Sequence, residues 1–326
     1  MPTLVLLALG LAAAPAPPTR PVHTYSIVAR DPATGSFGVA VQSHWFSVGS
    51  LVPWAEAGVG AVATQSFVEP SYGPLGLDLM RAGKSAPEAL KALLAADQHP
   101  DVRQVAMVDA QGRAAAHTGD HCIVAAGHTT GAGYSVQANL MDKPTVWPAM
   151  SRAYEGASGE FAERLLAALD AAEREGGDIR GRQSAAILIV RGTSTGRPWA
   201  DRLVDLRVDD SSEPLKELRR LLDRQRAYDR MNSGDEAVAR NDNEAALKEY
   251  AAAAALVSDE PELVFWHAVA LANMKRFDEA VALLQRVYLR EPRWAGLTPR
   301  LVAPGLLSAE AAKVIATRTA AATPKP

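Results

Sequence analysis

A chain of 326 residues is long enough for two domains, because one domain takes about 150 residues. Apolar residues make up 48% of the chain and charged residues 22%, an ordinary balance for a protein with a buried core, which excludes wholesale disorder. The formal net charge of −3 offers no basic field for nucleic acid, and the single cysteine, Cys122, excludes an internal disulfide framework and a cysteine-rich zinc module.

The first element in chain order is an apolar run from Leu4 to Ala14, followed by a proline-rich stretch. This run is too short to cross a bilayer but suits the apolar region of a signal peptide. No Lys or Arg precedes Arg20, so the usual basic start is missing. We expect residues 1–23 to be a signal peptide or leader, with no membrane span, and the mature protein to be periplasmic or secreted. A disordered Ala/Pro-rich start is the alternative.

From Thr24 onward, short apolar and alternating segments predict a sheet-containing domain. The expected strands are 24–30, 36–43, 104–109, 113–118, 133–137, 185–190 and 203–208. Apolar residues at three- and four-residue spacing predict helices over 72–82, 86–96, 145–154 and 160–175. Because strands and helices come in runs, the pattern favours a layered α+β domain over alternating βαβ units.

The composition changes near residues 205–214. Residues 1–200 hold only 15 of the 34 Lys and Arg and 17 of the 37 Asp and Glu, so the remainder is far denser in charge. No strand pattern remains after Pro214, and an offset of 34 residues pairs Gly234 with Ala268, Ala246 with Ala280, Tyr250 with Leu284 and Ala253 with Val287. This period is typical of tetratricopeptide repeats, so we predict a tetratricopeptide-like all-α domain over 211–320, after a domain over 24–210. A plain amphipathic bundle is the alternative.

Most familiar catalytic motifs are missing. A cluster of possible metal ligands (His117, Asp120, His121, Cys122 and His128) lies at a strand end, where a four-residue spacing does not align two histidines, so we interpret it as a polar turn and expect no metal. No serine-hydrolase elbow occurs. The glycine-rich segment 127–133 leads into a predicted strand and not into a helix, so we expect no phosphate or nicotinamide cofactor.

Thr24 is a candidate nucleophile because of its position. It opens the first predicted strand and lies just beyond the leader. A threonine hydroxyl needs a base, and an N-terminal threonine carries one in its own α-amine, whose pKa of about 8 leaves it partly neutral near neutral pH. Removal of the leader would supply that amine. Threonine is also a good strand former, so this position alone is weak evidence.

Several blocks of the first domain resemble one bacterial family. They are 24–32, 38–41, 51–65, 70–74, 136–139 and 181–186. The family is known as domain of unknown function 1028 and is placed in the N-terminal-nucleophile (Ntn) hydrolase superfamily; the helical half resembles a module that often follows it, sometimes described as peptidoglycan-binding. The resemblance implies a four-layer αββα sandwich that begins with the nucleophile at Thr24. In the family this threonine typically follows the initiator methionine, whereas here 23 residues precede it, so cleavage after His23 is required.

Supporting roles follow from residue chemistry within this resemblance. Asn139 is predicted to donate its amide to a tetrahedral oxyanion, a role worth about 3 kcal/mol, with a turn cap as the alternative. Arg182 either binds a substrate carboxylate or pairs with an acid such as Asp31. The polar residues predicted to support the site near strand ends are Ser43, Gln65, Gln183 and Ser184.

Together these features predict an exported hydrolase of a small amide or peptide-like bond, with Thr24 and Asn139 as catalytic residues. The alternative is a non-catalytic scaffold whose helical repeats dock a protein or peptidoglycan partner. Two repeats are few for independent docking, so the helical half is also a candidate for packing on the first domain or for forming a homo-oligomer. No nucleic-acid partner is expected.

Overall fold

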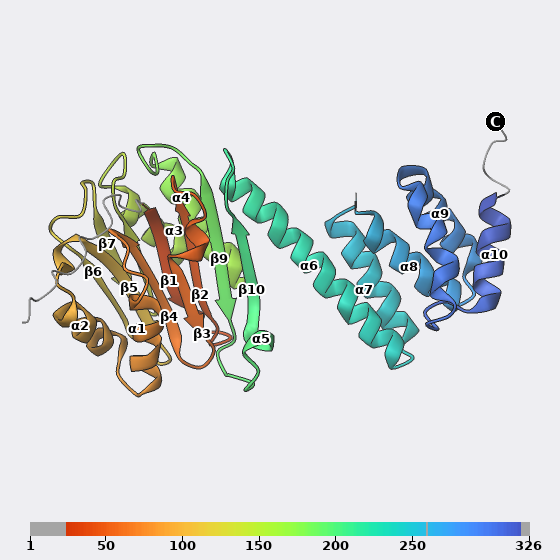
Figure 1. Ribbon diagram of the computed structural model, residues 1–326, viewed down its shortest axis with the longest axis horizontal. Helices are drawn as coiled ribbons and strands as arrows, with labels where there is room; N and C mark the ends of the chain where they lie inside the picture. The colour runs from red at the N-terminus through yellow and green to blue at the C-terminus, as the bar shows by residue number, and fades with distance from the viewer. Residues whose placement is uncertain (1–23, 259, 321–326) are drawn as a thin grey trace, which may run out of the picture. The chain divides into compact units, whose positions relative to one another are not determined.

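In the computed structural model, which describes residues 24–258 and 260–320, the chain divides into two units between Leu218 and Arg219 (Figure 1). The expected leader, residues 1–23, lies outside the described residues. Within the described ranges, no helix is both long and apolar enough to cross a membrane.

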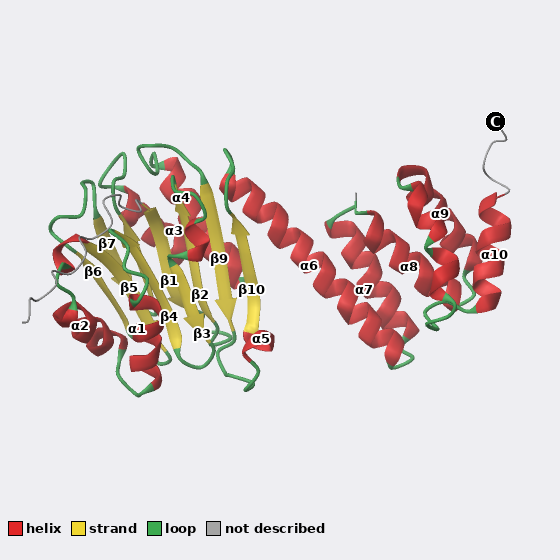
Figure 2. Ribbon diagram, in the orientation of Figure 1, coloured by secondary structure: helices red, strands yellow, loops and turns green. Residues whose placement is uncertain are grey.

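Two antiparallel sheets form the first unit (Figure 2). The six-stranded sheet has the order β10-β9-β2-β1-β8-β7, and the four-stranded sheet has the order β3-β4-β5-β6. The strands of the first sheet are Arg202–Val208 (β10), Ser184–Val190 (β9), Phe37–Ser43 (β2), Thr24–Arg30 (β1), Tyr134–Ala138 (β8) and Gly127–Gly131 (β7). Those of the second are Pro53–Glu56 (β3), Gly60–Ser66 (β4), Arg103–Asp109 (β5) and Ala114–Thr118 (β6). Strand β1 therefore lies inside its sheet, with a hydrogen-bonded neighbour on each side.

Helices cover the outer face of each sheet, and the inner faces pack on each other. Helices α3 (Val146–Gly156) and α4 (Phe161–Arg174) contact the six-stranded sheet, whereas α1 (Tyr72–Arg81) and α2 (Ala86–Ala96) contact the four-stranded sheet. A short helix, α5 (Pro198–Asp201), precedes β10. Small and β-branched residues, among them Val39, Ala63 and Val108, fill the space between the sheets. The predicted combination of sheets and helices in this half is confirmed.

Three strands, β3, β4 and β7, are not predicted by the alternation of apolar residues. Strand β4 is fully buried because a sheet covers one face and α1 the other, so its sequence GAVATQS does not alternate. Strand β7 contains Gly127 and Gly131 and lies at the sheet edge, and glycine in a strand removes the side-chain signal. The glycine-rich segment that leads toward β8 is thus itself largely a strand.

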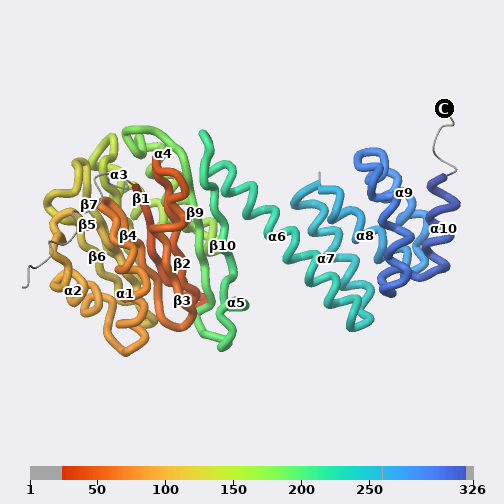
Figure 3. Tube along the Cα trace, viewed as in Figure 1, coloured from red at the N-terminus to blue at the C-terminus, as the bar shows by residue number. Residues whose placement is uncertain are grey.

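The second unit is helical in its described part. Its helices are α6 (Pro214–Ala239, which begins in the first unit), α7 (Asn243–Leu256), α8 (Pro261–Asn273), α9 (Phe277–Arg290) and α10 (Ala309–Ala320), and consecutive helices from α7 onward pack on one another (Figure 3). The residues matched by the 34-residue offset lie at buried positions or pack on buried side chains. The predicted all-helical character of this half is confirmed.

Gly234 gives a test of the close helix approach in this unit. A Cβ atom at this position would lie 2.7 Å from the ring of Tyr250, whose hydroxyl is held by Asp235 over 2.6 Å. We expect Gly234→Val to lower hydrogen-exchange protection of α6 and α7 by about tenfold or more, because the buried ring must shift. Gly296→Val is the matched control, since a Cβ there meets no atom within 4 Å. Equal protection in the two variants would contradict this packing.

Candidate active site

Thr24 begins β1 with its side chain between the sheets. Two residues further on, Ser26 Oγ donates to Gln65 Oε1 of the facing sheet over 2.7 Å, and strand alternation places Thr24 on the same face. Thr24 is fully buried, and its partner in the adjacent strand β2 is Ser43. Thr24 Oγ1 donates to Ser43 Oγ over 3.2 Å. The hydroxyl predicted to be the nucleophile is therefore held by a second hydroxyl.

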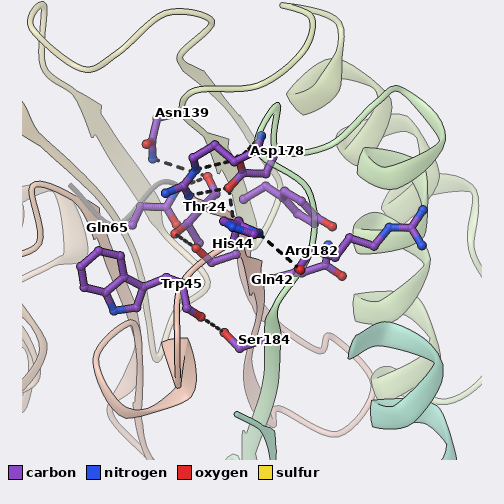
Figure 4. Close-up of polar contacts among 12 residues, drawn as sticks. Thr24, Gln42, His44, Trp45, Gln65, Asn139, Asp178, Arg182 and Ser184 are labelled. Atoms are coloured by element: carbon purple, nitrogen blue, oxygen red, sulfur yellow. Dashed lines mark hydrogen bonds and ion pairs between the residues drawn. The ribbon is translucent and has the colours of Figure 1, made fainter. Parts of the chain in front are cut away.

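Three N–H groups converge on the carbonyl oxygen of Thr24 (Figure 4). The backbone N of Asn139 and Nε2 of Gln65 each lie 3.1 Å from it, and Asn139 Nδ2 lies 3.4 Å from it. Because a carbonyl has two lone pairs, these contacts orient the peptide unit that follows Thr24 from two sides. The Asn139 side chain thus contacts Thr24 itself, through the longest of the three bonds.

Gln65 and Asn139 belong to a buried network of neutral amides. Gln104 Oε1 accepts from Gln65 Nε2 over 2.7 Å and from Asn139 Nδ2 over 2.8 Å. Gln137 Nε2 donates to the carbonyl of Ala63 across the inter-sheet space, over 3.1 Å. All four amide side chains are fully buried. Buried amides of this kind are stabilised by hydrogen bonds, and Gln137 Oε1 is the exception here, since it has no partner among the described residues. The remaining bonds join the two sheets and hold Thr24.

A second set of polar side chains lies on the helix-covered face of the same sheet. Tyr25 Oη and Gln42 Nε2 donate to Glu173 Oε1 over 2.5 and 2.6 Å, and Arg182 Nε pairs with the other oxygen of Glu173. Burial, followed by the charge of Glu173, raises the pKa of Tyr25 well above its usual value, so Tyr25 stays neutral. Arg182 also pairs with Glu213 over 2.9 Å.

Of the two interpretations of Arg182, ion pairing is the one its contacts support. Its partners are Glu173 and Glu213, and not Asp31, which pairs with Arg164 over 3.0 Å. The charge of Glu173 raises the pKa of Arg182, which fits a stable ion pair.

The other two predicted residues, Gln183 and Ser184, hydrogen-bond to the end of β2 and the segment that follows it. Ser184 Oγ accepts from Val48 N over 3.1 Å and donates to the carbonyl of Trp45. Gln183 donates its backbone N–H to Ser43 O over 3.1 Å, whereas its side chain bonds to Asp210 over 3.1 Å. The structure therefore groups Thr24, Ser43, Gln65 and Asn139 and places Gln183 and Ser184 in supporting positions.

Several residues of this region are not predicted by the sequence motifs. They are Gln104 and Gln137 of the amide network, Glu173 behind the sheet, and Asp178, whose buried carboxylate accepts from the backbone N of His44 over 3.2 Å (Figure 4). One signal could have found the two amides: Gln104 and Gln137 each stand beside apolar residues inside a fully buried strand, in RQVAMVD and YSVQA. A polar residue at such buried strand positions marks a network or a site.

In the cluster considered for metal binding, the side chains each contact a different partner. His117 Nε2 contacts the carbonyl of Pro100 at 2.7 Å, and His121 Nδ1 pairs with Asp101 at 2.6 Å. Cys122 Sγ donates to the carbonyl of Arg103 at 3.4 Å, and burial raises the pKa of its thiol. Across the described ranges, no group of three or more His, Cys, Asp or Glu side chains is arranged to hold a metal ion.

Comparison with known proteins identifies the first unit. A family described as being of unknown function, DUF1028, matches residues 24–218. Among solved structures, the crystal structure of protein SPO2555 from Silicibacter pomeroyi, a protein described with the same family, is 32% identical to this chain. It aligns with a TM-score of 0.55 over 61% of this chain and 84% of that chain. No curated protein sequence matches.

Proposed function

Because the chain belongs to the DUF1028 family, whose function is unknown, we propose its activity from its own residues: Thr24 hydrolyses a small amide or peptide-like bond. The observation that carries the proposal is the position of Thr24, at the start of an inner strand, with its hydroxyl on Ser43 and its carbonyl held by Gln65 and Asn139. The packing of two sheets between helices supports placement in the Ntn hydrolase superfamily as an αββα sandwich. Because a fold by itself does not establish an activity, the proposal rests on Thr24 and the residues that contact it.

In the proposed reaction, Thr24 Oγ1 attacks the carbonyl carbon of the substrate, and its proton passes to the free α-amine of Thr24. The resulting oxyanion takes a hydrogen bond from Asn139 Nδ2, which exchanges its 3.4 Å contact with Thr24 O for it. The tetrahedral intermediate then collapses, the C–N bond breaks, and the ammonium group returns the proton to the departing amine. Water, deprotonated by the same α-amine, cleaves the ester on Thr24 and releases the acid.

This mechanism requires removal of the leader. While His23 is joined to Thr24, the nitrogen of Thr24 is an amide and cannot accept a proton. A signal peptide over residues 1–23 fits a periplasmic or secreted enzyme in which export and activation coincide.

We expect the active protein to begin at Thr24, and intact-mass measurement of the active fraction checks this. A version made to begin at Thr24 should hydrolyse amides, whereas an uncleavable version that retains the leader should not. Activity in a chain that still carries His23 would contradict the mechanism.

A second candidate function rests on the helical unit, whose helices contain a cavity of about 650 Å³. Its lining includes Asp235, Val238, Asn243 and Trp266. The 34-residue offset and this cavity support a tetratricopeptide-like module that docks a protein or peptidoglycan partner, or a second copy of the chain. For a purely scaffolding protein, Thr24→Ala leaves cellular function intact and Val238→Glu abolishes it; the reverse result supports the hydrolase.

A further inference from the structure

A cavity of about 410 Å³ lies beside the buried amide network. Its lining includes Thr118 at the end of β6, Gly127 and His128 of β7, and Trp147 of α3. A Cβ on Gly127 would lie 2.5 Å from the Trp147 ring, so the indole packs directly on the strand backbone. The volume falls in the range of small-molecule sites.

The hydrogen bonds between this cavity and Thr24 have a defined direction. The backbone oxygens of Thr24 and Ala138 can only accept, so Gln65 must present Nε2 to Thr24 and Gln104 must present Nε2 to Ala138, the latter over 2.9 Å. Gln104 then presents Oε1 to Gln65 and its amide N–H to Thr118 Oγ1, over 2.9 Å. Thr118 Oγ1 is therefore an acceptor toward Gln104.

This direction leaves the hydrogen of Thr118 available to His128. Thr118 Oγ1 accepts from Gln104 and keeps its own hydrogen, which we assign to His128 Nδ1, 2.9 Å away. With Nδ1 as the acceptor, the neutral ring carries its hydrogen on Nε2. Partial desolvation, and secondly the neighbouring His117, lower the pKa of His128, in agreement with a neutral ring. Among the described residues, Nε2 of His128 has no hydrogen-bond partner, so it is available to a ligand.

We infer that this cavity binds a neutral carboxamide or peptide group of the substrate. His128 Nε2–H donates to the carbonyl oxygen of that group, and Asp120, which also lines the cavity, accepts from its N–H. Trp147 and Val124 cover the apolar part of the ligand. A free carboxylate is disfavoured, because Asp120 repels it.

This binding site extends the proposed function and rests on it, because a bound amide is a substrate only if Thr24 hydrolyses it. Gln104 contacts both Thr118 at the cavity and the two side chains that hold Thr24. A single side chain, Gln104, therefore connects the cavity with the residues that hold the nucleophile.

Benzamide is the probe, titrated by NMR into the full chain carrying Thr24→Ala, so that nothing is turned over. We expect the Trp147 indole and His128 ring signals to shift, and benzamide to bind about tenfold more tightly than benzoate. His128→Phe should weaken benzamide binding about tenfold, whereas His128→Gln, which keeps an N–H donor, should recover part of it. Asp120→Asn should remove most of the discrimination against benzoate.

Two results would overturn the inference: unshifted Trp147 and His128 signals, or benzoate binding as tightly as benzamide. The ¹⁵N spectrum of His128 adds an independent check, since a hydrogen on Nδ1 at neutral pH contradicts the assigned tautomer. If benzamide binds but the unmutated protein hydrolyses no amide, the proposed function is wrong and the binding site stands. If the protein hydrolyses amides but benzamide does not bind, the proposed function stands and the binding site is wrong.

Discussion

Replacing Thr24 by alanine should abolish amide hydrolysis, with kcat/KM falling by about a thousandfold or more, because no other group forms the acyl ester. Thr24→Ser is the matched variant: it keeps the hydroxyl and the α-amine and loses only a methyl group. We expect it to retain measurable activity, within about a hundredfold of the original protein. Both variants are assayed over a panel of small amides, in chains that begin at position 24.

The loss in Thr24→Ala must be separated from unfolding. Thr24 is fully buried, and its hydroxyl bonds to Ser43 over 3.2 Å, so the variant should lose about 1–2 kcal/mol of stability and remain folded. Urea denaturation measures this change. If a folded Thr24→Ala protein hydrolysed the same amides at the original rate, Thr24 would not be the nucleophile.

The largest effect on stability is expected at Gln104, in the centre of the amide network. Gln104→Met keeps the size of the side chain but leaves the buried N–H groups of Gln65 and Asn139, and the carbonyl of Ala138, short of a partner. Each buried group left unpaired costs about 1–3 kcal/mol, so we expect the free energy of unfolding to fall by about 3–5 kcal/mol in urea denaturation. Activity should fall as well, since Asn139 and Gln65 hold Thr24.

Gln111→Met serves as the control for Gln104→Met. Gln111 lies exposed in the turn between β5 and β6, where its Oε1 accepts from Arg113 over 2.9 Å. Loss of this exposed hydrogen bond should change the free energy of unfolding by no more than about 0.5 kcal/mol. Equal effects of the two substitutions would show that the amide network does not stabilise the fold.

Local sequence patterns predicted much of the fold. The strand that begins with Thr24 was predictable from its β-branched and aromatic residues, and α2 spans Ala86–Ala96 as its apolar spacing and N-terminal Ser85 indicate. Residues 53–66 gave no alternation, because β4 is covered on both faces. Whether a strand shows alternation depends on what covers it, and that is a property of the assembled layers.

The partners of the polar residues were not predictable in the same way. Arg182 could be expected to bind an anion, but its pairing with Glu173 depends on α4 lying behind β1 and β2. The contact of Gln104 with Asn139 depends on the register of β5 and β8 in two different sheets. Such contacts join residues far apart in the chain, and no local pattern encodes them.

The sequence by itself determined that a strand begins at Thr24, where the helical half begins, and that Thr24 follows a leader-like segment, because these features rest on local preference and periodicity. Only the tertiary structure decided that Thr24 is held by Ser43, Gln65 and Asn139, and that one amide, Gln104, connects this site to a cavity. The physical reason is that buried polar groups must be paired, and strand order and register determine which groups are close enough to pair.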